Sequence, residues 1–290
     1  KMTTKYKAEG QKNIIFEFPT SNPGKEQVVR IRKRFINKKT ENDSNIGMEH
    51  VTEEIFYSGV MMPLLYPYCY PITSISMSDE ISSKIIKAYE EATPHRPKRF
   101  VKTTTIDITE RKGFLMEDHT KCSPFSYPSD VLCIEIKPKS GQKTSSSLIK
   151  PTHDIKRRKC TYCLRQMLKF TVGDVDRKSS YCPRDLFSRC NERIKKALNN
   201  LFQDPQNNLK IFFRGDLCFT GKLGGKHDDM NAQKISDLSP LFGEFLNCYP
   251  ENSIETLQSL LTSIILESTP LFNIIKSIQD RDYYNIEVIA

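Results

Sequence analysis

The stretch VLCIEIKPKSG, residues 131–141, ends an apolar run with two lysines on either side of a proline. Side chains two residues apart in an extended strand point to the same face, so Lys137 and Lys139 are expected to project together. Pro138 has no N–H group to donate, and we expect the strand to end there. Two ammonium groups fixed side by side suit a ligand with several phosphates. A solvated, charged strand end explains the same residues, and composition alone favours that simpler interpretation.

Other basic residues between positions 96 and 169 could complete such a phosphate pocket. They are Arg96, Lys98, Arg99 and Lys169. A guanidinium group donates a fixed fork of hydrogen bonds that matches phosphate oxygens, whereas an ammonium group acts as a point charge. The pocket requires a fold that brings these positions beside Lys137 and Lys139.

A glycine-containing loop near the N-terminus could hold a nucleotide. The residues EGQKN, 9–13, precede a predicted strand at 13–18, and a second predicted strand at 28–32 carries Arg30. Glycine lets the backbone approach a phosphate closely. The N-lobe of a protein kinase has this layout, with a basic residue of the sheet at the α- and β-phosphates. An ordinary hairpin explains the loop equally well.

The chain of 290 residues carries 44 lysines and arginines against 35 acidic residues, a formal charge of +9. Such an excess implies an anionic partner, which could be nucleic acid, a membrane surface or a small polyanion. No segment offers the roughly 18 consecutive apolar residues that a membrane-spanning helix needs. We therefore expect no membrane-embedded part.

The nine cysteines are scattered along the chain. The first residues lack the apolar core of a signal peptide, so we expect reduced thiols in a cytoplasmic or nuclear protein. Cys160-x-x-Cys163 invites a zinc site with Cys182, Cys190 or His153, but structural zinc usually takes two closely spaced ligand pairs. No second pair is present, so core thiols are the preferred interpretation and no metal ligand is assigned.

The predicted elements place strands first and helices later. Strands are predicted at 13–18, 28–32, 99–108 and 131–137, and a hairpin at 209–219. Helices are predicted at 78–92, 160–170 and 183–205, with mostly amphipathic helix from 253 to the end. This order favours an α+β, two-lobed arrangement.

Several of these stretches together resemble one family, the inositol-pentakisphosphate 2-kinases. VLCIEIKPKSG resembles the Glu-Ile-Lys-Pro-Lys signature of that family, and CTYCLRQMLK (160–169) resembles the helix that follows it. YCPRDLFS (181–188) and PQNNLKIFFRGDL (205–217) are similar to the next two motifs, in order and at similar spacing. The resemblance continues in the glycine loop YKAEGQKN (6–13), the strand VVRIRK (28–33) and the hinge LMEDHT (115–120).

The resemblance implies an ATP-dependent kinase with a two-lobed fold distantly like that of protein kinases. It implies an N-lobe over residues 1–119 with a hinge at about 115–120, and a C-lobe over 120–290. The implied reaction is phosphorylation of the 2-hydroxyl of inositol 1,3,4,5,6-pentakisphosphate to give inositol hexakisphosphate, with ATP and Mg²⁺. Inositol pentakisphosphate and ATP are then the expected partners, and we expect a monomer.

Residue by residue, the resemblance implies two sets of contacts. The substrate phosphates would be held by Arg99, Lys139, Lys169, Asn207 and Asn208, with Lys137 close by and Arg34 as an N-lobe contact. The nucleotide side would comprise Gly10, Asn13, Arg30, Glu117, His119 and Glu135.

Two motifs of the family have no counterpart in these residues. They are an Asp-Cys-Ser segment with the general-base aspartate and an Asp-Leu-Asp-x-Lys segment with metal and phosphate ligands. We therefore assign no catalytic base and expect binding of ATP and inositol phosphate with little turnover by the chain as given. A non-catalytic polyanion- or RNA-binding protein and a kinase for a different inositol phosphate are the alternatives. Nucleic acid is the less favoured partner, because the basic residues fall inside kinase-like motifs instead of being interleaved with exposed aromatics.

Overall fold

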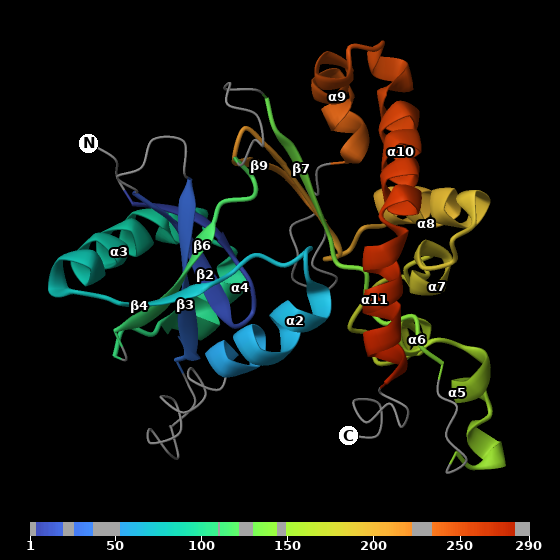
Figure 1. The fold of residues 1–290 in the computed structure, drawn as a ribbon, viewed down its shortest axis with the longest axis horizontal. Helices are drawn as coiled ribbons and strands as arrows, with labels where there is room; N and C mark the ends of the chain where they lie inside the picture. Colours follow the sequence, from blue (N-terminus) through green and yellow to red (C-terminus); the bar gives the residue numbers. More distant parts are fainter. Residues whose placement is uncertain are drawn as a thin grey trace. The chain divides into compact units, whose positions relative to one another are not determined.

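The computed structural model describes residues 4–19, 26–36, 53–109, 111–121, 130–143, 149–221 and 234–281. The chain divides into two compact units, residues 1–133 with 213–217 and residues 134–212 with 218–290. Figure 1 shows the elements of both, coloured along the sequence. The regular elements among the described residues are helices and the strands of antiparallel sheets, so the predicted α+β class is confirmed.

The first unit contains an antiparallel sheet. Its strands pair in the order β1-β2-β3-β6-β4, and β5 also pairs with β3. The strands are β1 Lys5–Glu9, β2 Asn13–Phe18, β3 Gln27–Phe35, β4 Thr73–Ser76, β5 Thr104–Ile106 and β6 Lys112–Glu117. The prediction of strand 13–18 is confirmed, and the predicted strand 28–32 extends to 27–35 because β3 pairs with β2, β6 and β5 in turn.

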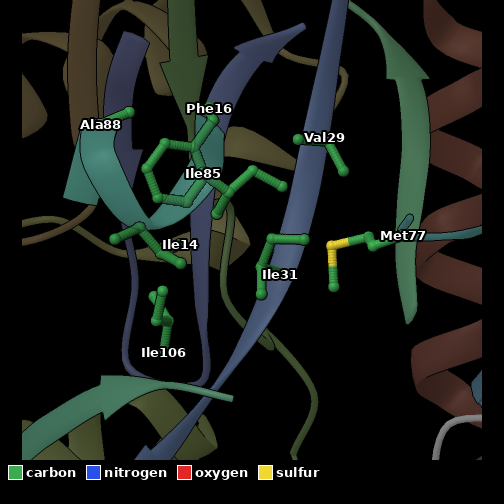
Figure 2. Packing of buried hydrophobic residues seen from close by; sticks show 8 residues of the cluster. All are labelled: Ile14, Phe16, Val29, Ile31, Met77, Ile85, Ala88 and Ile106. Atoms are coloured by element: carbon green, nitrogen blue, oxygen red, sulfur yellow. The ribbon is translucent and has the colours of Figure 1, made fainter. Parts of the chain in front are cut away.

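Helix α3 (Asp79–Ala92) confirms the prediction of a helix at 78–92. Ser78 caps it by accepting a hydrogen bond from the Ile81 N–H group at 3.3 Å, and two acidic residues in the first turn complement the helix dipole. The helix buries its apolar stripe against one face of the sheet. Figure 2 shows the resulting core, which consists of Ile14, Phe16, Val29, Ile31, Met77, Ile85, Ala88 and Ile106.

The predicted strand at 99–108 is wrong in its first half. Residues Lys98–Thr103 form helix α4, and the strand β5 begins only at Thr104. Pro97 stands immediately before the helix at φ −55°, a value that suits a helix start. The helix buries Phe100 to 6% exposure, so packing outweighs the strand propensity of these residues. Further helical segments of this unit include η2 Tyr57–Met61, α2 Met62–Leu65 and η3 Thr93–His95.

A three-stranded sheet in the order β7-β8-β9 accompanies the helices of the second unit, and the division between the units passes through its strands. The predicted strand 131–137 is confirmed as β7 (Leu132–Ile136), and the predicted hairpin as β8 (Leu209–Phe213) and β9 (Asp216–Thr220). Arg214 at φ 51° and Gly215 at φ 93° form the turn. Two successive left-handed residues match the twist of a two-residue hairpin.

Helix α6 (Thr161–Thr171) confirms the predicted helix at 160–170, but the predicted helix at 183–205 is interrupted. It is divided into α7 (Pro183–Leu186) and α8 (Asn191–Gln203). Arg189 adopts a left-handed φ of 60° between them, and a helix cannot continue through that conformation. The remaining helical segments are η4 Pro151–His153, α5 Ile155–Arg158, η5 Ile235–Leu238, α9 Ser239–Leu246, α10 Pro250–Glu267 and α11 Thr269–Asp280. Among the described residues, no helix has the length and apolar character needed to span a membrane.

Candidate functional site

Cationic side chains gather beyond the end of β7, in the second unit. The strand ends at Ile136, so the prediction that Pro138 stops it is confirmed. The pKa of Lys139 is lowered from its ordinary 10.5, first by burial and then by the positive charges of Lys137, Lys169 and Arg165. The structure thus brings together the three predicted lysines and adds an arginine that the sequence interpretation missed. Like charges crowded in this way favour a bound anion.

The backbone of Lys139 is held in an uncommon conformation. Its φ is 60°, which costs a non-glycine residue roughly 1–2 kcal/mol. Gln279 of α11 stabilises this turn, because its side-chain amide donates to the Lys139 carbonyl at 3.2 Å and accepts from the Gly141 N–H group at 3.1 Å. The Tyr181 hydroxyl donates to the Pro138 carbonyl at 2.8 Å. The segment that presents Lys139 is therefore fixed on both sides.

Helix α6 positions the other two cations of the cluster. Buried Gln166 exchanges side-chain hydrogen bonds of 2.9 and 3.0 Å with Gln206, and it accepts another from the Ser179 N–H group at 3.2 Å. These bonds anchor the buried face of the helix. Arg165 and Lys169 lie on exposed positions of the same helix. Gln166 is the glutamine of the Cys-x-x-Cys-x-x-Gln motif, so its residue type was a signal for this anchoring role.

Three further predicted site residues lie close to β7 and β8. The Lys137 N–H group donates to the Asn208 carbonyl at 2.8 Å. The Asn208 side chain is 1% exposed and donates to the Tyr162 hydroxyl at 2.9 Å, while its Oδ1 atom has no partner among the described residues. Asn207 is half-buried. Glu135 faces Lys210 at 3.3 Å and Lys137 at 4.0 Å.

The predicted nucleotide-side residues of the first unit lie on the sheet and its first turn. The Gly10 N–H group donates to the Asn13 carbonyl at 2.8 Å, which closes the β1–β2 turn. Nothing described lies within 4 Å of the position that a Cβ atom at Gly10 would take. Arg30 on β3 forms an ion pair of 2.8 Å with Glu53 and lies 4.9 Å from the centre of the Phe114 ring.

The other predicted residues of this unit are more scattered. Glu117 ends β6, and the His119 ring lies 4.5 Å from that of Tyr70. Arg34 is exposed on β3 opposite Thr105. Arg99 belongs to α4, but its side chain is outside the part that the structure describes. The prediction that these residues bind substrate or nucleotide stays a prediction.

Arg96 does not belong to a phosphate pocket, which corrects the sequence interpretation. Its Nε atom donates to Glu9 at 2.9 Å and its Nη2 atom at 3.0 Å. Lys33 reaches the same carboxylate at 2.9 Å, and the three side chains are at most 1% exposed. Fully buried and paired, this arginine cannot reach a ligand in solution.

Three cysteines meet in the second unit. The sulfur atoms of Cys160, Cys163 and Cys182 all lie within 4.8 Å of one another. The pKa of Cys182 is lowered, first by hydrogen bonds from Cys160 and Cys163, whereas that of Cys163 is raised, first by its hydrogen bond with Cys160. Thiolates suit zinc, so these residues could supply three ligands. A metal site formed by these three cysteines is therefore an alternative to the predicted core thiols. Cys190 and His153 are not part of the group.

Comparisons with known proteins give the family. A model of the inositol-pentakisphosphate 2-kinases matches residues 6–290. The chain belongs to this family. The predicted family and its class of activity, a phosphotransferase, are thereby confirmed.

The relatives within the family come from distant organisms. The rice protein (Oryza sativa subsp. indica) is 29% identical over 97% of this chain and 68% of its own length. The zebrafish (Danio rerio) protein is 31% identical over 82% of this chain and 48% of its own, and the Arabidopsis thaliana protein 28% over 74% and 53%. All three are named inositol-pentakisphosphate 2-kinase. Each is longer than the part that this chain matches.

Proposed function

We propose that this protein transfers a phosphoryl group from ATP to the 2-hydroxyl of inositol 1,3,4,5,6-pentakisphosphate. In this proposal the second unit holds the inositol phosphate and the first unit holds the nucleotide. Family membership over residues 6–290 supports the reaction class, and the names of the relatives supply the substrate.

The cation cluster of the second unit carries the proposal. Lys139 is half-buried, and this burial, followed by the charges of Lys137, Lys169 and Arg165, lowers its pKa. Such crowding is unfavourable in the empty protein, so a ligand with several phosphates gains from every cation that it neutralises. Phosphoryl transfer demands little covalent chemistry from the protein and depends mostly on positioning and charge neutralisation. A fixed cationic surface is suited to that task.

The ion pair between Arg30 and Glu53 supports the nucleotide part of the proposal. In protein kinases, a cationic residue on the third strand is held by a glutamate of a neighbouring helix and contacts the nucleotide phosphates. Arg30 lies on β3, and Glu53 lies at the start of a helical segment. The open space over Gly10 would allow a phosphate to approach the first turn of the sheet.

Magnesium expected with ATP enters no step of this proposal. In phosphoryl-transfer sites Mg²⁺ is bound by phosphates and one or two carboxylates. Glu135, the carboxylate closest in sequence to the lysines, is engaged by Lys210 and Lys137. A carboxylate that already compensates two ammonium groups does not fit as a metal ligand.

Calorimetric titration with inositol pentakisphosphate tests the proposal. We expect binding to be salt-sensitive, because exposed charge interactions are screened. The Lys139→Ala, Lys169→Ala double variant, which lacks two of the cations, should bind at least tenfold more weakly. Lys195→Ala, Lys196→Ala is the matched control, since it removes the same charge from exposed positions of α8. Equal affinity of both double variants and the parent protein would overturn the site. Equal affinity for RNA and for inositol pentakisphosphate would favour the polyanion-binding alternative.

The nucleotide half is tested separately. Arg30→Ala should weaken ATP binding and leave the affinity for inositol pentakisphosphate within about twofold. Arg111→Ala is the control, because Arg111 is an exposed arginine of the same unit that pairs with Asp79 at 2.8 Å. If both variants bind ATP as the parent protein does, Arg30 has no role at the nucleotide.

A further inference from the structure

The second unit also contains a cationic pocket, whose lining does not include the lysines of the cluster around Lys139. Its volume is about 460 Å³, within the roughly 300–1,000 Å³ typical of small-molecule sites. The wall is made by the segment after Lys139, by α7 and the turn that follows it, by α8 and by α11. The lining residues are Gly141, Gln142, Lys143, Arg184, Phe187, Ser188, Arg193, Lys276, Gln279 and Asp280.

The lining of this pocket has an excess of positive charge. It contains Lys143, Arg184, Arg193 and Lys276, against the single carboxylate of Asp280. Arg193 and Lys276 have acidic partners, Asp185 at 2.8 Å and Asp280 at 2.5 Å. Within the described chain, no hydrogen bond or ion pair engages the Lys143 ammonium or the Arg184 guanidinium. The pocket therefore offers two uncompensated cations beside two partly compensated ones.

The two uncompensated cations come from separate parts of the chain. Lys143 is half-buried and follows the segment clamped by Gln279, whereas Arg184 is exposed on α7. The amide of Gln279 lines the pocket and is also bonded to Lys139 and Gly141. One wall of the pocket is thus formed by the residues that directly follow Lys139 and by the glutamine that holds the turn at Lys139.

We propose that this pocket binds a small molecule with two or more phosphate groups, at a site separate from the cluster of Lys137, Lys139 and Lys169. The guanidinium of Arg184 provides a two-pronged contact, and the ammonium of Lys143 provides a point charge in the same lining. Arg193 and Lys276 also contact the phosphates, by exchanging Asp185 and Asp280 for phosphate oxygens. An inositol polyphosphate and an inorganic polyphosphate share the chemistry that this site recognises.

Binding here is coupled to the first cluster through Gln279, a consequence that rests on the proposed function. A ligand that shifts Gln279 alters the hydrogen bonds to the Lys139 carbonyl and the Gly141 N–H group. The affinity of the Lys139 cluster for inositol phosphate then changes, and linkage requires an equal reciprocal effect on the pocket.

Calorimetric titrations with pyrophosphate and with inositol hexakisphosphate test the pocket. We expect Lys143→Ala, Arg184→Ala to remove one binding event, or to weaken it at least tenfold, while Lys195→Ala, Lys196→Ala leaves it unchanged. The control pair lies on α8 outside the pocket lining and carries the same charge. Binding of only inositol hexakisphosphate at this event identifies an inositol phosphate as the ligand, and binding of both compounds identifies a general polyphosphate site.

Three results separate this inference from the proposed function. An event that survives Lys139→Ala, Lys169→Ala but not Lys143→Ala, Arg184→Ala supports the pocket, whether or not inositol pentakisphosphate binds to the lysine cluster. Equal titrations of the parent protein and the pocket variant overturn it. Weakening by the control pair to the same degree also overturns it, because the effect is then one of net charge. Arg184→Glu, with its melting temperature measured, guards against misfolding, since reversal of charge should abolish the event in a folded protein.

Discussion

The two units contain contrasting clusters of charge. In the first unit, Lys33 and Arg96 share the carboxylate of Glu9, and all three side chains are at most 1% exposed. In the second unit, Lys139 is only partly buried, and its pKa is lowered first by that burial and then by its neighbours Lys137, Lys169 and Arg165. One cluster is compensated within the protein, and the other has an excess of one sign.

Burial and pairing distinguish the structural charges of this chain from those proposed to bind a ligand. A buried ion pair stays charged only with a partner in good geometry, and losing that partner is costly. Removing one member of a half-exposed group of like charges costs the folded protein little stability. Binding of an anion to such a group stabilises it. The sequence placed Arg96 with the phosphate-binding candidates because it is basic and close to Arg99. Its burial and its partner place it in the structural class.

Glu9→Gln should produce the largest change in stability. The substitution keeps the shape of the side chain but leaves Lys33 and Arg96 buried without a counter-charge, which costs about 3–5 kcal/mol. Urea unfolding of the parent and variant proteins measures the loss. Glu80→Gln is the control, since Glu80 pairs with Lys84 on the surface of α3 at 2.6 Å, and exposed pairs of this kind contribute little to stability. Equal losses in both variants would contradict the assignment of Glu9 as the structural counter-charge.

Lys139→Met should leave stability unchanged or raise it, in contrast to Glu9→Gln, and should strongly weaken binding. Removing a partly buried cation from beside Lys137 and Lys169 relieves repulsion, so the urea midpoint should stay the same or rise. Affinity for inositol pentakisphosphate should fall at least tenfold, since a charge-assisted hydrogen bond contributes about 1.5–3 kcal/mol. A variant that is clearly destabilised would place Lys139 with the structural charges of the first unit instead.

The sequence predicted the strands and helices that carry the motifs better than it predicted the segments between them. Strand 13–18, the end of β7 at Pro138 and helix α6 follow from alternation, a missing N–H group and helical spacing, which are local properties. Helix α4 and the break at Arg189 depend on tertiary packing and on a left-handed residue, for which the sequence holds no clear signal. The partner of Arg96, Glu9, lies 87 positions away on β1, so no local pattern could reveal it.

Gln279→Met should have a moderate effect on both properties. It removes two hydrogen bonds to the Lys139 and Gly141 backbone, each contributing about 0.5–1.5 kcal/mol. Stability should fall by about 1–2 kcal/mol, and affinity for inositol pentakisphosphate by a few fold, because the left-handed turn at Lys139 loses its support. Gln203→Met, at an exposed position of α8, should change neither. A loss of stability with unchanged affinity would show that the turn does not need this clamp to present Lys139.

The smallest expected effect is the pH dependence that Lys139 gives to stability. The pKa of Lys139 is lowered from 10.5 in the folded protein by burial and by its cationic neighbours. Between that lowered pKa and 10.5 the unfolded chain binds more protons than the folded one, so the contribution of Lys139 to stability rises with pH across this window. Below the window the charged lysine remains a constant penalty. The difference in unfolding free energy between the parent protein and Lys139→Met should therefore shrink as the pH rises.

Inositol pentakisphosphate should reverse the shift in the pKa of Lys139, because phosphates favour the charged ammonium. Calorimetry in buffers of different ionisation enthalpy should then detect proton uptake on binding. A difference that is flat over the window, with no proton uptake, would mean that the cations around Lys139 do not interact strongly enough to form one site.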